Sequence, residues 1–320
     1  MNNPERELQG LYTSSNQASF KSQREIERGD SSIQKEWENP YGEPSFNDLI
    51  VEAVRRREWR EQHDYIPNEA EVTIKTTEPI VICNLADPHM GAKEVDYEYI
   101  RHLVDTIKYN DNAFCTLGGD MCESISWNPG QNETILNFQE QYEMLYGMLR
   151  ELKGKIIGGV IGNHAWEEKT GVSKYQEFLR NADAPLFDNL GWLSLNLDNG
   201  IDSIPYNIAL IHKAKGYSYH NPNHPQGRFS KEVEGCDIII SNHTHTDGVQ
   251  STSKSLFGGR TKSQTFINGF TLKRNDNFLK GNGNPDSAVG ANWLYLSPHS
   301  KQHFAIPTTE LTYEVMGWKV

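Results

Sequence analysis

Short apolar runs alternate with amphipathic segments through the middle of the chain. The runs are bounded by turn residues and predict buried strands, at residues 80–83, 113–117, 155–161, 206–211 and 237–241. Between the first three runs, apolar residues recur every three or four positions, which predicts helices over about 96–107 and 135–152. Strands that alternate with helices are typical of βαβ units, so the sequence predicts an α/β fold.

The second half of the chain has a different pattern. After a predicted helix near 174–180, strands follow one another with short connections, at 192–197, 206–211, 237–241, 264–270, 292–296 and 311–315. This half is therefore predicted to add a second sheet.

The N-terminal part lacks this alternation. Residues 1–44 are polar without periodicity and are predicted to be extended or disordered. Apolar residues at helical spacing follow Ser45 and predict a helix to about Gln62. Its arginine-rich segment 55–60 could contact phosphate, but neighbouring glutamates favour a solvated helix face. The predicted domains are an N-terminal arm with an amphipathic helix, 1–70, and an α/β domain, 71–320.

Composition and charge limit the classes of function and the cellular locations that the sequence supports. The formal net charge of −12 repels polyanions, which disfavours extended binding to duplex nucleic acid and leaves contact with a strand end open. The four cysteines have no C-x-x-C spacing, which favours reduced residues in a cytoplasmic protein. No apolar run approaches the about 20 residues that span a bilayer, and the first residues lack an apolar signal segment. Neither membrane insertion nor secretion is expected.

Side chains that bind metals follow five of the predicted strands. They occur in Asp87-Pro88-His89, Gly118-Gly119-Asp120, Gly162-Asn163-His164, a lone His212 and Asn242-His243-Thr244-His245. The carboxyl edge of the sheet is where α/β proteins form their sites. Carboxylate and imidazole groups suit Zn, Fe, Mn or Ni. The sequence therefore indicates a centre for two metal ions.

Each fragment alone is weak evidence. A lone histidine such as His212 is more often structural, and Asp87-x-His89 is as often a cap and turn as a ligand pair. All five fragments in one order, each at a strand end, favour a metal centre over coincidence. Two cations about 3.5 to 4 Å apart need a shared anionic ligand, and Asp120 is the candidate because a carboxylate can bridge. A water between the ions would lose its proton near neutral pH and attack phosphorus as a bridging hydroxide.

The order of these fragments resembles that of the calcineurin-like metallophosphoesterases, whose pattern runs D-x-H, G-D, G-N-H, H and G-H-x-H. The resemblance covers about residues 77–245 and, by the predicted strands, extends to about 306. It implies two mixed β-sheets packed face to face and flanked by helices. It also implies the ligand sets, which are Asp87, His89, Asp120 and His245 for one metal and Asp120, Asn163, His212 and His243 for the other.

The same resemblance implies roles for two further residues. His164 would contact the scissile phosphate and protonate the leaving oxygen. Glu123 would orient His164.

Two positions depart from the family pattern. Asn242 replaces the usual Gly before His243, and the turn is expected to be kept because Asn tolerates a left-handed backbone. Ala165 replaces the usual acidic residue after His164, which removes a carboxylate that supports this loop unless Glu167 or Glu168 substitutes.

Within the family, the chain is similar to phage and bacterial members loosely related to DNA-repair exonucleases. The implied activity is that of a phosphodiesterase or nuclease on nucleotides or nucleic-acid ends. The implied cofactors are two divalent metal ions, Mn foremost, with Fe, Zn or Ni as alternatives. A phosphomonoesterase for phosphoprotein or metabolites is the other enzyme considered, and a metal-binding scaffold without turnover is the non-enzymatic alternative.

Candidate substrate contacts lie in the insert after His212. His220 and His224 are candidates there, together with Arg260 further along the chain, and aromatic residues such as Tyr217 could stack on a base. The insert could equally be a self-packed polar loop, and scattered basic residues are usually solvated surface.

Overall fold

The computed structural model describes residues 46–63, 68–123, 134–163, 181–218, 220–255, 258–259, 261–275, 280 and 288–319. Contacts divide the chain into two units, Met1–Tyr65 and Ile66–Val320. The first unit contains α2 (Phe46–His63), a helix where the sequence predicts one. The predicted boundary at residue 70 falls inside β1 (Glu69–Lys75), the first strand of the second unit.

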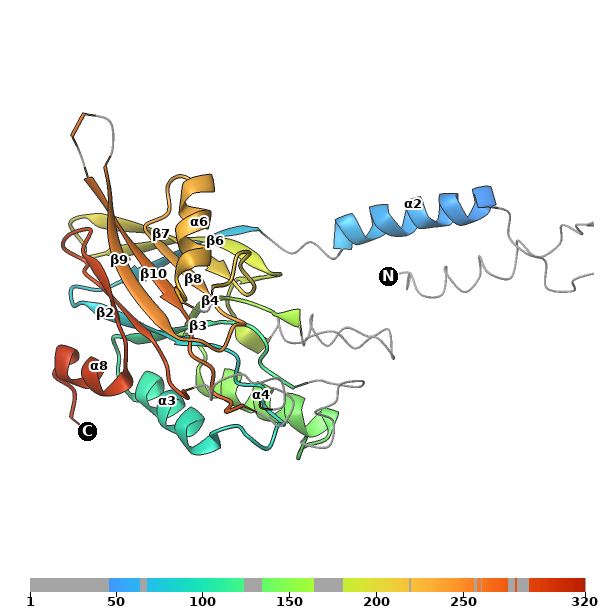
Figure 1. Ribbon diagram of the computed structural model, residues 1–320, viewed down its shortest axis with the longest axis horizontal. Helices are drawn as coiled ribbons and strands as arrows, with labels where there is room; N and C mark the ends of the chain where they lie inside the picture. Colours follow the sequence, from blue (N-terminus) through green and yellow to red (C-terminus); the bar gives the residue numbers. More distant parts are fainter. Residues whose placement is uncertain are drawn as a thin grey trace, which may run out of the picture. The chain divides into compact units, whose positions relative to one another are not determined.

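One six-stranded sheet of the second unit, sheet A, is built mainly from the later part of the chain (Figure 1). Its strands are β1, β6 (Leu190–Asp198), β7 (Ser203–Ile211), β8 (Ile238–Ser241), β9 (Gly248–Ser255) and β10 (Thr261–Asn268). They are ordered β1-β6-β7-β8-β10-β9. The pairs β1/β6, β7/β8 and β8/β10 are parallel, and β6/β7 and β9/β10 are antiparallel.

The other six-stranded sheet, sheet B, combines early strands with two late ones. Its strands are β2 (Ile80–Leu85), β3 (Ala113–Leu117), β4 (Ile156–Val160), β5 (Leu186–Phe187), β11 (Trp293–Leu296) and β12 (His303–Ile306). They are ordered β12-β11-β2-β3-β4-β5. Strands β2 to β5 pair in parallel, while β11 is antiparallel to both its neighbours.

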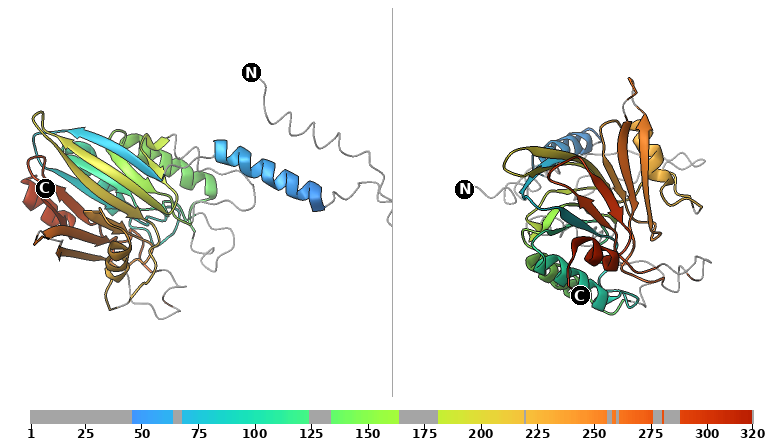
Figure 2. Two further views of the ribbon diagram at one scale, coloured as in Figure 1. Left: turned by 90° about the horizontal axis from the view of Figure 1, so that it is seen from above. Right: turned by 90° about the vertical axis from the view of Figure 1, so that its left-hand side faces the viewer.

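Helices cover the outer faces of the two sheets. The helices are α3 (Tyr97–Tyr109), α4 (Phe138–Glu151), α6 (His224–Glu232) and α8 (Thr309–Met316). Side chains of α3, α4 and α8 pack on the outer face of sheet B, and α6 packs on sheet A. Figures 1 and 2 show how these helices lie along the two sheets. The predicted class of fold, two mixed sheets face to face and flanked by helices, is confirmed.

Strand β2 shows how the sequence supplies both cores. Ile80 and Ile82 point into the layer between the sheets, whereas Val81 and Cys83 pack beneath the helices. A strand with apolar residues on both faces is what a sheet covered on both sides requires. Within the described residues, no helix has the length and apolar character needed to cross a membrane.

Capping side chains set where the helices begin. Asp96 caps α3, with its carboxylate accepting a hydrogen bond from the backbone N–H of Tyr99. Asn137 and Glu140 form a capping box at the start of α4. Ile135, which the sequence places on the buried stripe of this helix, lies before the box and is 57% exposed.

The predicted strand at 311–315 is wrong, because this segment lies in α8. Thr308 caps the helix by accepting a hydrogen bond from the N–H of Leu311, and Gly317 ends it with a φ of 66°. The buried residues Thr309 and Thr312 are three positions apart, which is a helical spacing that is easily missed when threonine is counted as polar. The sequence pattern did not predict α6, β9 or β12, which are polar or short. The predicted helix near 174–180 lies outside the described residues.

An ion-pair cluster at the amino end of β8 ties it to its neighbours. The Asp237 carboxylate is 1% exposed, accepts a hydrogen bond from the N–H of Asn207, and lies 3.0 Å from Lys262 Nζ and 2.9 Å from Lys301 Nζ. Burial alone would raise the pKa of Asp237, but these partners lower it below its usual value. Its stabilising effect is therefore present above the unfolded-state pKa and is lost as the pH falls through the lower folded-state pKa.

Asp237→Asn is expected to lower the free energy of unfolding by about 2 kcal/mol at pH 7, because both lysines lose their counter-charge. The difference from wild type should shrink as the pH falls below about 4, because the unfolded chain then takes up a proton at this carboxylate that the folded state still resists. Urea denaturation at several pH values measures both effects. A difference that stays constant down to pH 3 would contradict this role of the charge.

Candidate metal centre

The parallel strands deliver the predicted ligands to one edge of the two sheets. Asp87 and His89 follow β2, Asp120 follows β3, Asn163 follows β4, His212 follows β7, and His243 and His245 follow β8. Strands β2, β3 and β4 are neighbours in sheet B, and β7 and β8 are neighbours in sheet A. Their carboxyl ends therefore bring these residues together, as in other α/β sites.

The backbone turns sharply where the ligand candidates sit. In the described part of the chain, six residues other than glycine have a positive φ, and five of them are predicted ligands: Asp87 (45°), His89 (46°), Asp120 (46°), His243 (74°) and His245 (52°). A left-handed backbone is unfavourable for residues with a Cβ and persists only where the surroundings enforce it. Such strain concentrates at functional sites.

Two glycines make room for these side chains. A Cβ on Gly119 (φ 95°) would overlap the ring of His212, and a Cβ on Gly162 (φ 87°) would overlap the carboxylate of Asp120. Gly119 and Gly162 are thus required both for their backbone conformation and for the close approach of a ligand candidate.

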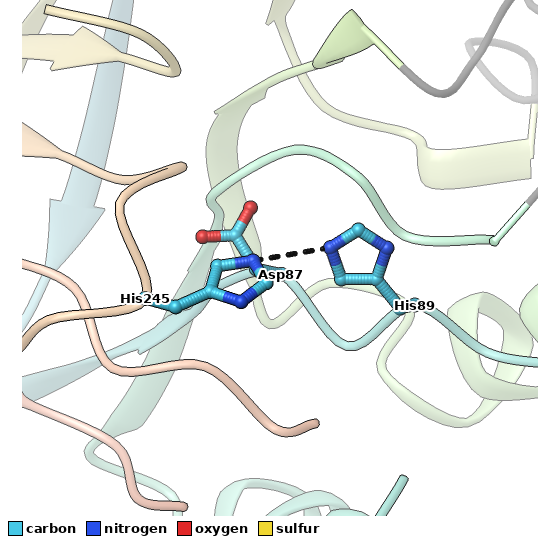
Figure 3. Close-up of side chains that lie close together, drawn as sticks. All are labelled: Asp87, His89 and His245. Carbon is cyan, nitrogen blue, oxygen red and sulfur yellow. Dashed lines mark hydrogen bonds between the residues drawn. The ribbon is translucent and has the colours of Figure 1, made fainter. Parts of the chain in front are cut away.

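The first group of ligand atoms comes from Asp87, His89 and His245, and these atoms lie within 4.8 Å of one another. Nε2 of His89 and Nε2 of His245 lie 3.2 Å apart, with the two rings in an edge-on arrangement (Figure 3). Asp87 accepts a hydrogen bond from the N–H of His243 on Oδ2, while its buried Oδ1 has no hydrogen-bond partner among the described residues. A buried, unsatisfied carboxylate oxygen beside two imidazole nitrogens suits a cation.

The second group comes from Asp120, His212 and His243, also within 4.8 Å. Oδ2 of Asp120 lies 3.1 Å from Nε2 of His212 and 3.9 Å from Nδ1 of His243. The side-chain Oδ1 of Asn163 is 3.1 Å from the same Nε2 of His212. The two groups adjoin, because Nδ1 of His212 is only 3.7 Å from Oδ1 of Asp87.

Burial and mutual charge shift the pKa values of this cluster in opposite directions. Burial raises the pKa of Asp87 to about 8 in spite of the nearby His212. Burial would also raise the pKa of Asp120, but contacts with His212 and His243 and the charge of His89 lower it below its usual value. Burial, the neighbouring His89 and Lys273 lower the pKa of His245, so this imidazole is neutral and has a lone pair to offer.

The donor set fits two divalent cations. It combines carboxylates, an amide oxygen and neutral imidazole nitrogens, which is the mixture that Mn, Fe, Zn and Ni accept. A cation at the first group would satisfy the buried Oδ1 of Asp87. The surrounding structure enforces the strained backbone of these loops and so holds the donors in place.

Other predicted site residues lie in different settings. His164, Ala165 and Arg260 are outside the described residues. His220 is exposed on the insert, and the exposed His224 holds the insert together through a 2.7 Å hydrogen bond between its Nδ1 and the carbonyl of Gly216.

Glu123 is buried, and its Oε2 lies 2.8 Å from Nδ1 of His89. The expected contact with His164 stays a prediction.

The expectation for Asn242 is wrong in detail. The left-handed turn falls at His243, and Asn242 is not among the residues with a positive φ. Its side chain accepts a hydrogen bond from Asn84 at 2.8 Å and donates one to the carbonyl of Gly118 at 3.0 Å. Asn242 therefore supports the centre through its amide group, a role that glycine could not fill.

Supporting residues also come from β10 and the segment after it, in roles that the sequence did not predict. Asn268, at the end of β10, donates a 2.8 Å hydrogen bond to the hydroxyl of Thr244, between the two histidines of the β8 loop. Lys273 lies in the segment after β10 and pairs with Glu123. The position of Asn268 directly after the apolar residues of β10 was a signal for its role, whereas Lys273, five residues further along, had no such signal.

No protein-family model matches the sequence, and no curated protein matches it. Similar solved structures include a metallophosphoesterase from Sphaerobacter thermophilus, with 14% identity, a TM-score of 0.37, and coverage of 75% of this chain and 95% of that one. A conserved uncharacterized protein from Streptococcus pneumoniae, described as a predicted phosphoesterase, has 11% identity and a TM-score of 0.31, covering 72% of this chain and 100% of that one. Vps29 from Entamoeba histolytica, complexed with Zn²⁺, has 12% identity and a TM-score of 0.32, covering 71% and 97%.

Gly162→Ala is expected to weaken Mn²⁺ binding at least about tenfold, because the new Cβ would displace Asp120. Isothermal titration calorimetry measures the affinity. Gly200→Ala is the matched control, since Gly200 has nearly the same φ (85°) but open space around its Cβ. Both variants should lose about 1 to 2 kcal/mol of stability from the left-handed backbone, and equal metal affinities in the two variants would contradict the predicted displacement.

Proposed function

We propose that this chain is a dinuclear metal-dependent phosphoester hydrolase. One ion would be held by Asp87, His89, Asp120 and His245, and the other by Asp120, Asn163, His212 and His243. The observation that carries the proposal is the pair of adjoining ligand groups, assembled from four strand ends on largely strained backbone, with Asn163 beside them from a fifth strand end. A pair of cations that share a carboxylate suits displacement at phosphorus better than other chemistry.

When bound, the two ions would supply Lewis-acid activation of water and neutralise the charge of the phosphate. The residues around them set the electrostatics. Asp120 supplies the shared negative charge, and Asn163 contributes a neutral oxygen that leaves more positive charge at its ion. The N–H of His243 orients the carboxylate of Asp87. His164 follows Asn163 directly and would protonate the leaving oxygen as general acid.

We further propose that the substrate is a phosphodiester of a nucleotide or a nucleic-acid end. Tyr217 supports this choice, because its side chain is 49% exposed and its hydroxyl lies 3.5 Å from that of Thr246, the residue after His245. An exposed aromatic ring beside the ligand loop suits stacking on a base. The net charge of −12 favours a small or terminal substrate over a long duplex. The four cysteines are free and buried, in keeping with the proposed cytoplasmic location.

The proposed chemistry predicts Mn²⁺-dependent hydrolysis of bis-p-nitrophenyl phosphate. Asp120→Ala and His164→Ala should each lower kcat at least about 100-fold, because the first removes the shared ligand and the second the proton donor. Release of p-nitrophenol measures the rate. Equal rates in wild type and both variants would reject the proposal.

Faster hydrolysis of the monoester p-nitrophenyl phosphate would favour a phosphomonoesterase. Two bound ions without hydrolysis of any substrate in a broad phosphoester panel would favour a metal-binding scaffold.

Tyr217→Ala is expected to raise the KM for thymidine 5′-(p-nitrophenyl) phosphate roughly tenfold through loss of stacking. The KM for methyl p-nitrophenyl phosphate, which has the same leaving group and no base, should hardly change. Tyr217→Phe is the control that keeps the ring. An equal change for both substrates would show that the ring has no part in base recognition.

A further inference from the structure

A buried ion pair lies behind the first group of ligand atoms. Lys273 is 4% exposed and Glu123 is 3% exposed, and the lysine Nζ lies 3.1 and 3.3 Å from the two carboxylate oxygens. A buried ammonium and a buried carboxylate are each unfavourable without a partner. Contact of one ammonium with both oxygens fixes the plane of the Glu123 carboxylate.

The same carboxylate reaches a proposed metal ligand. Oε2 of Glu123 lies 2.8 Å from Nδ1 of His89. Nδ1 is the ring nitrogen nearest this negative charge, which attracts the ring proton to Nδ1 and, in a neutral ring, leaves the lone pair on Nε2. That Nε2 is the atom that faces His245 at 3.2 Å (Figure 3).

The backbone locks these groups to one another. The hydroxyl of Thr271 and the N–H of Leu272 both donate to the carbonyl of Asp87, at 3.0 and 3.3 Å. The N–H of Glu123 donates to the carbonyl of Met90 at 3.0 Å. The segment that carries Lys273 and the segment that carries Glu123 are therefore each attached to the loop that carries Asp87 and His89.

We infer that Lys273 and Glu123 are positioning residues for the first metal site. Lys273 holds the Glu123 carboxylate in one orientation, and Glu123 sets the tautomer and the ring direction of His89. The inference rests on the proposed metal centre and adds to it two residues that touch neither metal nor substrate. Hydrogen-bond partners of ligating histidines commonly change metal affinity by 10- to 100-fold when they are removed.

The experiment is a calorimetric titration of the full chain with Mn²⁺ after removal of bound metal by a chelator. Wild type should bind two ions. Glu123→Gln should weaken one of the two binding steps by 10- to 100-fold and leave the other within about threefold. Lys273→Met should weaken the same step. The double variant Glu123→Gln/Lys273→Met should match Glu123→Gln alone, because the lysine acts through the carboxylate.

The double variant should fold more readily than the single variants, because it leaves neither charge of the buried pair without a partner. Asp237→Asn is the matched control, because Asp237 is an equally buried carboxylate paired with lysines at the amino end of β8, and this variant should bind both ions as wild type does. The melting temperatures of the metal-free variants separate loss of fold from loss of affinity. Lys273→Arg, which keeps the charge, should restore at least part of the affinity that Lys273→Met loses.

Three results would overturn the inference. They are wild-type affinity in the double variant, tighter Mn²⁺ binding in Lys273→Met, and losses in the two single variants that multiply in the double variant. Tighter binding would mean that the lysine merely repels the ion. Wild-type protein that binds no Mn²⁺ would reject the proposed function and the inference together, whereas two bound ions with unaffected variants would reject the inference alone.

Discussion

Two aspartates that are almost fully shielded from water, Asp87 and Asp120, impose the main constraint on this structure. Ionised carboxylates at such positions need compensating charge or hydrogen bonds. The N–H of His243 compensates one oxygen of Asp87, and the ring of His212 lies against Asp120. The lysine of this region, Lys273, is held by Glu123 behind His89. A cation binds where electron-pair donors surround buried carboxylates. The need of these carboxylates for a counter-charge therefore links the fold to the proposed function.

The fold holds this cluster by opposing backbone strain with buried hydrogen bonds. Left-handed residues such as Asp120 and His243 would relax if their loops were free. Asn242 joins the loop after β8 to Asn84 of β2 and to the carbonyl of Gly118, across the two sheets. Asn268 fixes the same loop from β10 through Thr244. A fully paired polar network of this kind makes the ligand positions rigid, so the geometry does not depend on flexible side chains alone.

The sequence pattern was sufficient for an α/β fold with a second sheet and for the residues that converge, because both follow from the strands and their ends, while the face-to-face packing of the sheets came from the family resemblance. Apolar runs such as 113–117 have one simple periodicity, and parallel strands carry the residues after them to one edge. Elements without that signal were missed. The helix α6 is polar and contains Pro225 and Gly227. The threonines of α8 are β-branched residues that are typical of strands, so this helix was predicted as a strand. The hydrogen bonds and ion pairs that support the ligands could not be predicted either, because the partners of Asn242 and Glu123 lie in distant segments of the chain.

Diffraction at the manganese absorption edge, on crystals grown with Mn²⁺, tests the central claim most directly. The account predicts two anomalous peaks about 3.5 to 4 Å apart, both in contact with the carboxylate of Asp120, with His89 and His245 on one and His212 and His243 on the other. Crystals that contain Mn²⁺ and show no peak at these residues, or show peaks only elsewhere on the protein, would contradict it.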